Sequence, residues 1–142
     1  MMQSIDAWDS IPDSKRKDRR YRARWKVMLV FGGASKIPNF QTLIHDLSST
    51  GMSVQYHSEV KAHTVLTILL ALPPKDGVPR KVIKLKAEVK SSIPFRGGFR
   101  LGMIFVPDAE LDNLRQRLKT YIVSDDMLCT DPEAEELPKL NF

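Results

Sequence analysis

Residues 42–57 read TLIHDLSSTGMSVQYH, and this stretch decides the fold expected for the chain. Thr42–Leu47 and Met52–His57 have the apolar and β-branched composition of short strands. The residues between them, Ser48-Ser49-Thr50-Gly51, are small and end in glycine, which permits a tight turn. The stretch therefore predicts a β-hairpin.

Four more strands are expected outside this hairpin. Their sequences are rich in Val, Leu and Ile, and the segment 81–89 alternates apolar residues with mostly charged ones, as expected when one face of a strand meets water. The four strands are Arg24–Phe31, Thr64–Leu72, Lys81–Val89 and Phe99–Val106, with turn residues at Gly32–Pro38, Asp76-Gly77 and Arg96-Gly97-Gly98. Six short strands at this spacing are typical of a β-sandwich or a β-barrel.

One helix is expected to follow the strands. Asp108, which comes after Pro107, can cap its first turn. Apolar residues then recur at helical spacing, at Leu111, Leu114, Leu118 and either Tyr121 or Ile122. This apolar stripe should pack on the strands, and the periodicity ends after Val123.

The length of the chain suits one domain. With 142 residues and 16.2 kDa, it is long enough to bury a hydrophobic core of its own. We expect a flexible basic leader over residues 1–17, the folded domain over residues 18–123 and an acidic flexible tail over residues 124–142.

Charge is distributed unevenly along the chain. Between Lys15 and Lys26 there are eight basic residues and one acid, whereas residues 125–142 contain six acids and one lysine. The net charge of +5 and the pI near 9.4 indicate an anionic partner, and the basic run is the natural place for it. The acids of the tail, including Asp131, are expected to be a solvated surface.

Several classes of protein are not expected. No stretch approaches the roughly eighteen uninterrupted apolar residues of a transmembrane helix, and residues 1–12 lack the pattern of a secretory signal. The lone Cys129 cannot form an internal disulfide, so a cytoplasmic location is expected. His45, His57 and His63 have no regular ligand spacing, which argues against a metal site, and no cofactor is expected. The sequence lacks a nucleophile elbow, a phosphate-binding glycine loop and paired carboxylates, so a binding function is expected.

Two short motifs point to a particular kind of binding. Arg20-Tyr21-Arg22-Ala23-Arg24 sets arginines four residues apart before the first strand, and Asp46-Leu47-Ser48-Ser49-Thr50-Gly51 occupies the hairpin turn. Together they resemble PilZ domains, a bacterial family with RxxxR in an N-terminal loop and (D/N)xSxxG at the end of the second strand. The resemblance covers about residues 16–122 and includes Leu101–Phe105, which looks like the family's final strand.

The resemblance implies both a fold and a function. The implied fold is mainly β: a six-stranded antiparallel PilZ-like β-barrel with a C-terminal α-helix. The implied function is that of a non-enzymatic receptor for the bacterial second messenger cyclic di-GMP, in which the second motif wraps a guanine and the arginines close over it. The candidate ligand-binding residues are Arg19, Arg20, Arg24, Asp46, Ser48 and Gly51, with Arg16, Arg22 and Arg100 as weaker candidates.

The chemistry of these residues agrees with such a ligand. Guanidinium groups bind phosphate oxygens and the O6/N7 edge of guanine in a bidentate manner. A spacing of four puts Arg20 and Arg24 on one side of an extended segment or of a helical turn, and Arg22 joins them only if the segment is extended. Asp46 can accept hydrogen bonds from guanine, and Gly51 permits a close backbone approach or a positive φ.

Three functions remain open at this stage. The first is a cyclic di-GMP receptor whose N-terminal arginine loop changes conformation and signals to an unidentified protein partner, because a lone domain would act in trans. The second is an adaptor of the same fold that needs no ligand. The third is a small nucleic-acid-binding β-barrel, against which the scarcity of aromatic residues argues. The process controlled (motility, polysaccharide or pili) and the ligand stoichiometry (monomer or intercalated dimer) also stay open.

Overall fold

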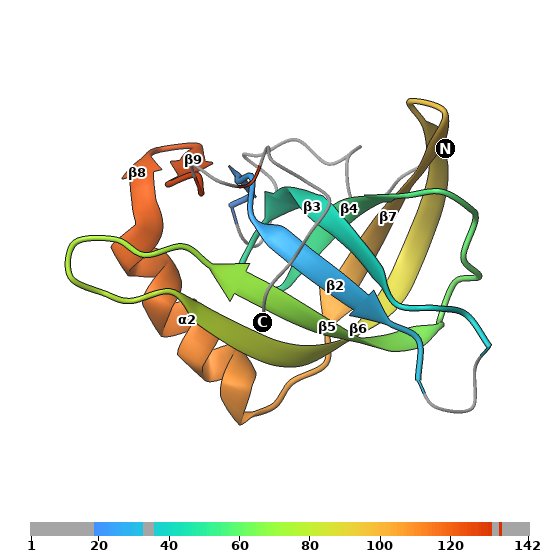
Figure 1. The fold of residues 1–142 in the computed structure, drawn as a ribbon, viewed down its shortest axis with the longest axis horizontal. Coiled ribbons are helices and arrows are strands. Elements are labelled where there is room, and N and C mark those ends of the chain that lie inside the picture. The colour runs from blue at the N-terminus through green and yellow to red at the C-terminus, as the bar shows by residue number, and fades with distance from the viewer. Residues whose placement is uncertain (1–18, 33–35, 132–133, 135–142) are drawn as a thin grey trace.

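Six antiparallel strands close into a barrel in the order β2-β5-β6-β7-β4-β3, because β2 pairs with both β5 and β3 (Figure 1). The computed structural model describes residues 19–32, 36–131 and 134. The barrel strands are β2 (Lys26–Val30), β3 (Phe40–Leu47), β4 (Gly51–Tyr56), β5 (Val65–Leu72), β6 (Lys81–Phe95) and β7 (Gly98–Phe105). The remaining elements are β1 (Tyr21–Arg22), α2 (Ala109–Tyr121), β8 (Ile122–Ser124) and β9 (Met127–Leu128). The predicted six-stranded barrel with a C-terminal helix is confirmed.

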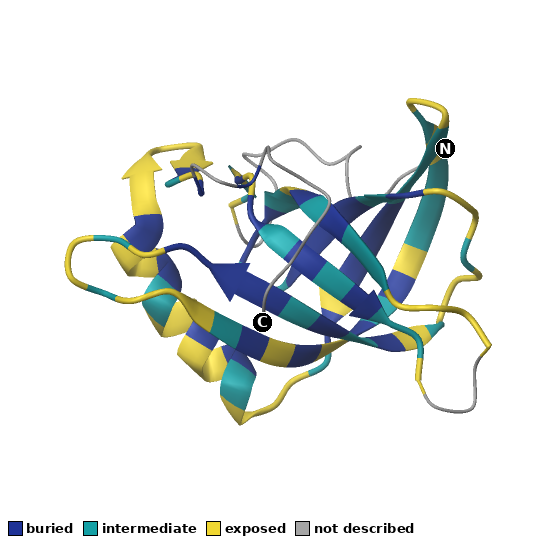
Figure 2. Cartoon of the chain, viewed as in Figure 1, coloured by how far each residue is buried: buried dark blue, intermediate teal, exposed yellow. Residues whose placement is uncertain are grey.

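Alternation along the strands builds the core of the barrel. In β6, Ile83 and Leu85 are buried whereas Lys84 and Lys86 are exposed, as the sequence predicted. Because successive side chains of a strand point to opposite faces, one face fills the barrel and the other meets water. Figure 2 shows the result as dark-blue and yellow bands that alternate along β6.

Strand β6 is longer than predicted. The expected strand ended at Val89, but β6 continues to Phe95 and stays paired with β7. A register shift between Val89 and Ser91 interrupts the alternation, so the sequence pattern ends while the backbone pairing continues. The two strands therefore project beyond the barrel as a hairpin (Figure 1).

Helix α2 covers one end of the barrel (Figure 1). The side chain of Asp108 caps it as predicted, accepting a hydrogen bond of 3.0 Å from the backbone N–H of Leu111. Its buried face ends with Tyr121, and Ile122 is exposed, which decides between the two residues left open by the sequence. No helix in the described part of the chain is both long and apolar enough to cross a bilayer.

The segment after α2 differs from the flexible tail that the sequence predicted. Strands β8 and β9 form a small antiparallel pair, and β9 also pairs in parallel with β1. The side chain of Leu128 is fully buried, and the backbone N–H of Cys129 donates to the carbonyl of Tyr121. Contacts with residues far away in the sequence therefore order this segment, although it has no periodicity of its own.

Asp131 is also different from the solvated acid that was expected. Its carboxylate is buried and accepts two hydrogen bonds from the guanidinium of Arg80, at 2.6 and 3.1 Å. A bidentate pair of this kind is among the stronger polar contacts in proteins. It fastens the C-terminal segment to the loop before β6. The predicted leader, residues 1–17, lies outside the described residues, as do residues 132–133 and 135–142 of the tail.

Removing the Asp131 carboxylate should destabilise the fold. We expect Asp131→Asn to lower the free energy of unfolding by about 1.5–3 kcal/mol, because charged hydrogen bonds to a partly buried guanidinium are lost. Urea unfolding measures this effect. Asp125→Asn, in the exposed turn between β8 and β9, removes the same charge and should have little effect. Equal stabilities of the two variants would contradict the role given to Asp131.

Candidate ligand-binding site

The arginine motif lies directly against the hairpin motif. Strand β1 pairs with β3 in antiparallel register, so that Arg22 lies opposite Asp46. The segment is extended, since Ala23 and Trp25 are buried while Arg22 and Arg24 are exposed. By this alternation, Arg22 joins the face that carries Arg24, which is the condition that the sequence analysis set for its involvement.

Trp25 anchors this segment in the core. Its side chain is fully buried, packs edge-on against Tyr121 of α2 with ring centroids 5.2 Å apart, and donates from its indole nitrogen to the carbonyl of Cys129. These contacts tie the arginine segment to the helix and to the chain after β9. The position of the exposed arginines is therefore set by their buried neighbours.

The hairpin motif contributes a carboxylate and a rigid turn. Asp46 is half-buried, and its Oδ1 accepts a hydrogen bond of 2.9 Å from the hydroxyl of Ser53. A β-bulge between Ile44 and Asp46 shifts the register of β3, and the residue within it, His45, is exposed. Asp46 thus lies opposite Arg22 in the strand pairing, on the strand that carries His45.

Ser48 and Gly51 have structural roles within the turn. The buried hydroxyl oxygen of Ser48 lies 3.2 Å from the backbone nitrogens of Thr50 and Gly51, both of which donate to it. Gly51 begins β4, and it is not among the described glycines that have a positive φ. Both were candidate ligand residues, but neither lines the cavity that lies beside Arg22 and Arg24, described next.

A cationic cavity of about 400 Å³ lies beside the arginine segment. Its walls come from β1 and the residues after it, β3, the β6–β7 turn and the β9 segment, and contain no acidic side chain. The lining residues are Arg22, Ala23, Arg24, Ile44, His45, Arg96, Met127 and Thr130. Three guanidinium groups around one cavity favour an anionic ligand with several oxygen acceptors.

The projecting β6–β7 hairpin supplies residues that the sequence analysis missed. Phe95 lies under two guanidinium groups, with Arg96 5.0 Å and Arg100 4.8 Å from its ring centroid. The ring of His45 meets Phe95 edge-on at 5.6 Å, and its Nε2 lies 3.1 Å from Nη1 of Arg100. Arg100, a weaker candidate, is therefore in contact with a residue of the cavity wall.

The turn of this hairpin explains the position of Arg96. Arg96 and Gly97 both have positive φ values, 52° and 78°, which is the pattern of a tight type I′ turn. A Cβ atom on Gly98 would lie 2.5 Å from the carbonyl oxygen of Tyr56, so only glycine fits there. The glycine turn was predicted from the sequence, but its approach to the cavity depends on the extended pairing of β6 with β7.

The other candidates lie at the edge of this arrangement or outside it. Arg19 is exposed, with its guanidinium 6.0 Å from the ring centroid of Tyr21, and Arg20 is half-buried. Arg16 lies outside the described residues. Among the described residues, no three His, Cys, Asp or Glu side chains form a group that could hold a metal ion.

The chain matches the model of the PilZ domain over residues 14–124, and it belongs to this family. PilZ domains are non-enzymatic receptors for cyclic di-GMP. The matched range contains the arginine motif, the hairpin motif and α2, and it ends before β9 begins. A search of curated proteins found no match.

Solved structures support the same fold. The chain resembles the Bacillus subtilis inhibitor of motility MotI/DgrA with a TM-score of 0.57 and 18% identity, over 72% of this chain and 48% of that protein. It resembles the PilZ domain of Escherichia coli YcgR with cyclic di-GMP with a TM-score of 0.52 and 14% identity, over 72% of this chain and 87% of that chain. It resembles the K. pneumonia MrkH complex with cyclic di-GMP with a TM-score of 0.51 and 15% identity, over 75% of this chain and 53% of that chain. The chain thus spans about half the length of the Bacillus and K. pneumonia proteins.

A serine substitution tests the structural role of the hairpin turn. We expect Ser48→Ala to lower the free energy of unfolding by about 1–3 kcal/mol, because the backbone N–H groups of Thr50 and Gly51 lose their buried acceptor. Ser49→Ala is the matched control, since Ser49 is the less buried neighbour. Thermal or urea unfolding measures the stability of both variants. Equal stabilities would contradict the structural role given to Ser48.

Proposed function

We propose that this chain binds cyclic di-GMP at the arginine cavity, changes the conformation of its arginine segment on binding and signals to a partner protein. The observation that carries the proposal is the β1–β3 pairing, which sets Arg22 opposite Asp46 and brings the two motifs to one site. Membership of a family of cyclic di-GMP receptors supports it.

The site has the groups that recognition of this ligand requires. Cyclic di-GMP carries two phosphodiesters and two guanines, and the guanidinium groups of Arg22, Arg24 and Arg96 can bind phosphate oxygens or the O6/N7 edge of guanine. Asp46 lies opposite Arg22 but does not line the cavity; its carboxylate, with one oxygen held by the hydroxyl of Ser53, can accept from guanine N–H groups of a ligand that extends toward it. Arg19 and Arg20 come just before Arg22 in the sequence, and they can add contacts to the same anion.

The C-terminal segment connects the arginine segment to an exposed apolar surface. The backbone N–H of Arg22 donates to the carbonyl of Asp126 at 3.0 Å, and Arg22 pairs with Met127 of β9. Met127 both lines the cavity and exposes 40% of its surface, and Ile122 and Val123 of β8 are also exposed. A ligand that moves β1 would therefore move an apolar surface that a partner protein can read.

Binding of cyclic di-GMP should depend on Arg24. We expect Arg24→Ala to weaken binding by roughly tenfold to a hundredfold, because a charged hydrogen bond to the ligand is worth about 1.5–3 kcal/mol. Isothermal titration calorimetry at physiological salt measures the change. Lys84→Ala is the matched control, because it removes one exposed positive charge from the outer face of β6, away from the cavity.

Competition distinguishes this proposal from its alternatives. A specific site prefers cyclic di-GMP over GTP, GMP and oligonucleotides, whereas a general phosphate-binding surface prefers none of them and loses affinity steeply with salt. If titration of the unmodified protein with cyclic di-GMP releases or absorbs no heat, an adaptor that acts through protein contacts alone is favoured instead. Equal affinities of Arg24→Ala and Lys84→Ala would overturn the site assignment.

A further inference from the structure

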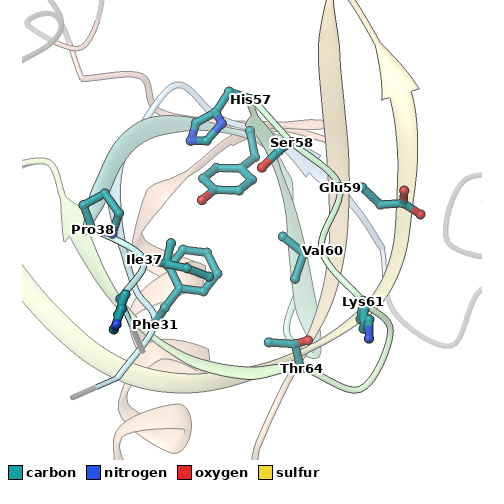
Figure 3. Close-up of a pocket in the computed structure, with 11 residues that line it drawn as sticks. Phe31, Ile37, Pro38, His57, Ser58, Glu59, Val60, Lys61 and Thr64 are labelled. Atoms are coloured by element: carbon teal, nitrogen blue, oxygen red, sulfur yellow. The ribbon is translucent and has the colours of Figure 1, made fainter. Parts of the chain in front are cut away.

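A second cavity, of about 620 Å³, lies at the mouth of the barrel away from α2. It is enclosed by Phe31 and residues 36–38 on one side and by the connection from β4 to β5 on the other (Figure 3). It shares no lining residue with the arginine cavity. Its volume falls within the range of small-molecule sites, which often occur in barrel mouths.

The walls of this cavity are mainly apolar. Figure 3 shows Phe31 and Ile37 facing Val60 across it, and Pro38 lies at its edge. Ile37 exposes 47% of its surface, so part of its side chain is accessible at the opening of the cavity.

Aromatic rings form one side of the cavity. The ring of Tyr56 lies 5.6 Å from that of Phe31, 5.0 Å from that of Phe40 and 4.2 Å from that of His57. Burial raises the pKa of the Tyr56 hydroxyl, an effect that a hydrogen bond with Ser58 partly opposes. A tyrosine hydroxyl is protonated at neutral pH in any case, so it can donate a hydrogen bond to an anion.

The charged groups at the rim are mostly positive. Lys36 and Lys61 line the opening and are exposed, so each can place an ammonium group over a ligand while its stem covers apolar surface. Glu59 is the one acid of the lining, and Figure 3 shows Glu59 and Lys61 both on the outer side of the loop that carries Val60, from which the long side chain of Lys61 can reach the opening. The rim therefore complements a negative headgroup.

We propose that this cavity binds a small amphiphilic anion, with an acyl or aromatic body against Phe31, Ile37 and Val60 and one negative headgroup toward Lys36 and Lys61. The site is separate from the arginine cavity and does not depend on the function proposed for it. A polar or cationic small molecule would lack partners on the apolar walls or meet like charge at the rim.

Fluorescence of 8-anilinonaphthalene-1-sulfonate, an aromatic anion, tests the proposal with the full chain. We expect saturable binding of one probe molecule per chain, displacement by decanoate, and displacement by decyltrimethylammonium that is at least tenfold weaker. Ile37→Glu should weaken probe binding at least tenfold, because it adds a carboxylate at the mouth. Val65→Glu, the same kind of change at an apolar residue that is 53% exposed outside the cavity, should leave binding unchanged.

Two results would overturn the inference. The first is absence of saturable probe binding, or equal binding by Ile37→Glu and the unmodified protein. The second is equal displacement by decanoate and decyltrimethylammonium, which would exclude the anionic class. Arg24→Ala should bind the probe normally, so the result stays separate from the outcome at the arginine cavity.

Discussion

Strand β1 contains only two residues, yet it pairs with β3 on one side and with β9 on the other. The residues that follow it, Ala23 and Trp25, are buried in the core and hold the segment in an extended conformation. The arginines that alternate with them are therefore held at the surface, next to Asp46. The candidate site depends on this arrangement, because the two motifs are otherwise separated by more than twenty residues of sequence.

The candidate site next to this pairing is rich in positive charge. Arg22, Arg24 and Arg96 surround one cavity whose walls carry no acidic side chain. An anion with several oxygen acceptors is the kind of ligand that such a set of guanidinium groups favours. The core of the barrel, the helix and the Arg80–Asp131 pair hold the elements around this cavity in place.

The sequence predicted what depends on local pattern. Strand alternation and helical spacing located the elements of the barrel, and two short motifs named Arg24, which lines the arginine cavity, and Asp46, which lies opposite Arg22. His45 and Arg96 were missed as site residues because a bulge and the extension of β6 bring them to the cavity, and both arise from pairing between strands distant in sequence. The burial of Asp131 was missed for the same reason, since its partner lies 51 residues away.

The central claim is that an anionic ligand binds where β1 meets β3. The most direct test is to follow backbone amide signals by nuclear magnetic resonance as cyclic di-GMP is added. The account predicts that the largest changes occur at residues 22–25, 45–46, 96 and 127–130, and that residues 58–61, which line the other cavity, stay unchanged. Changes confined to residues 58–61, or no changes at saturating ligand, would contradict it.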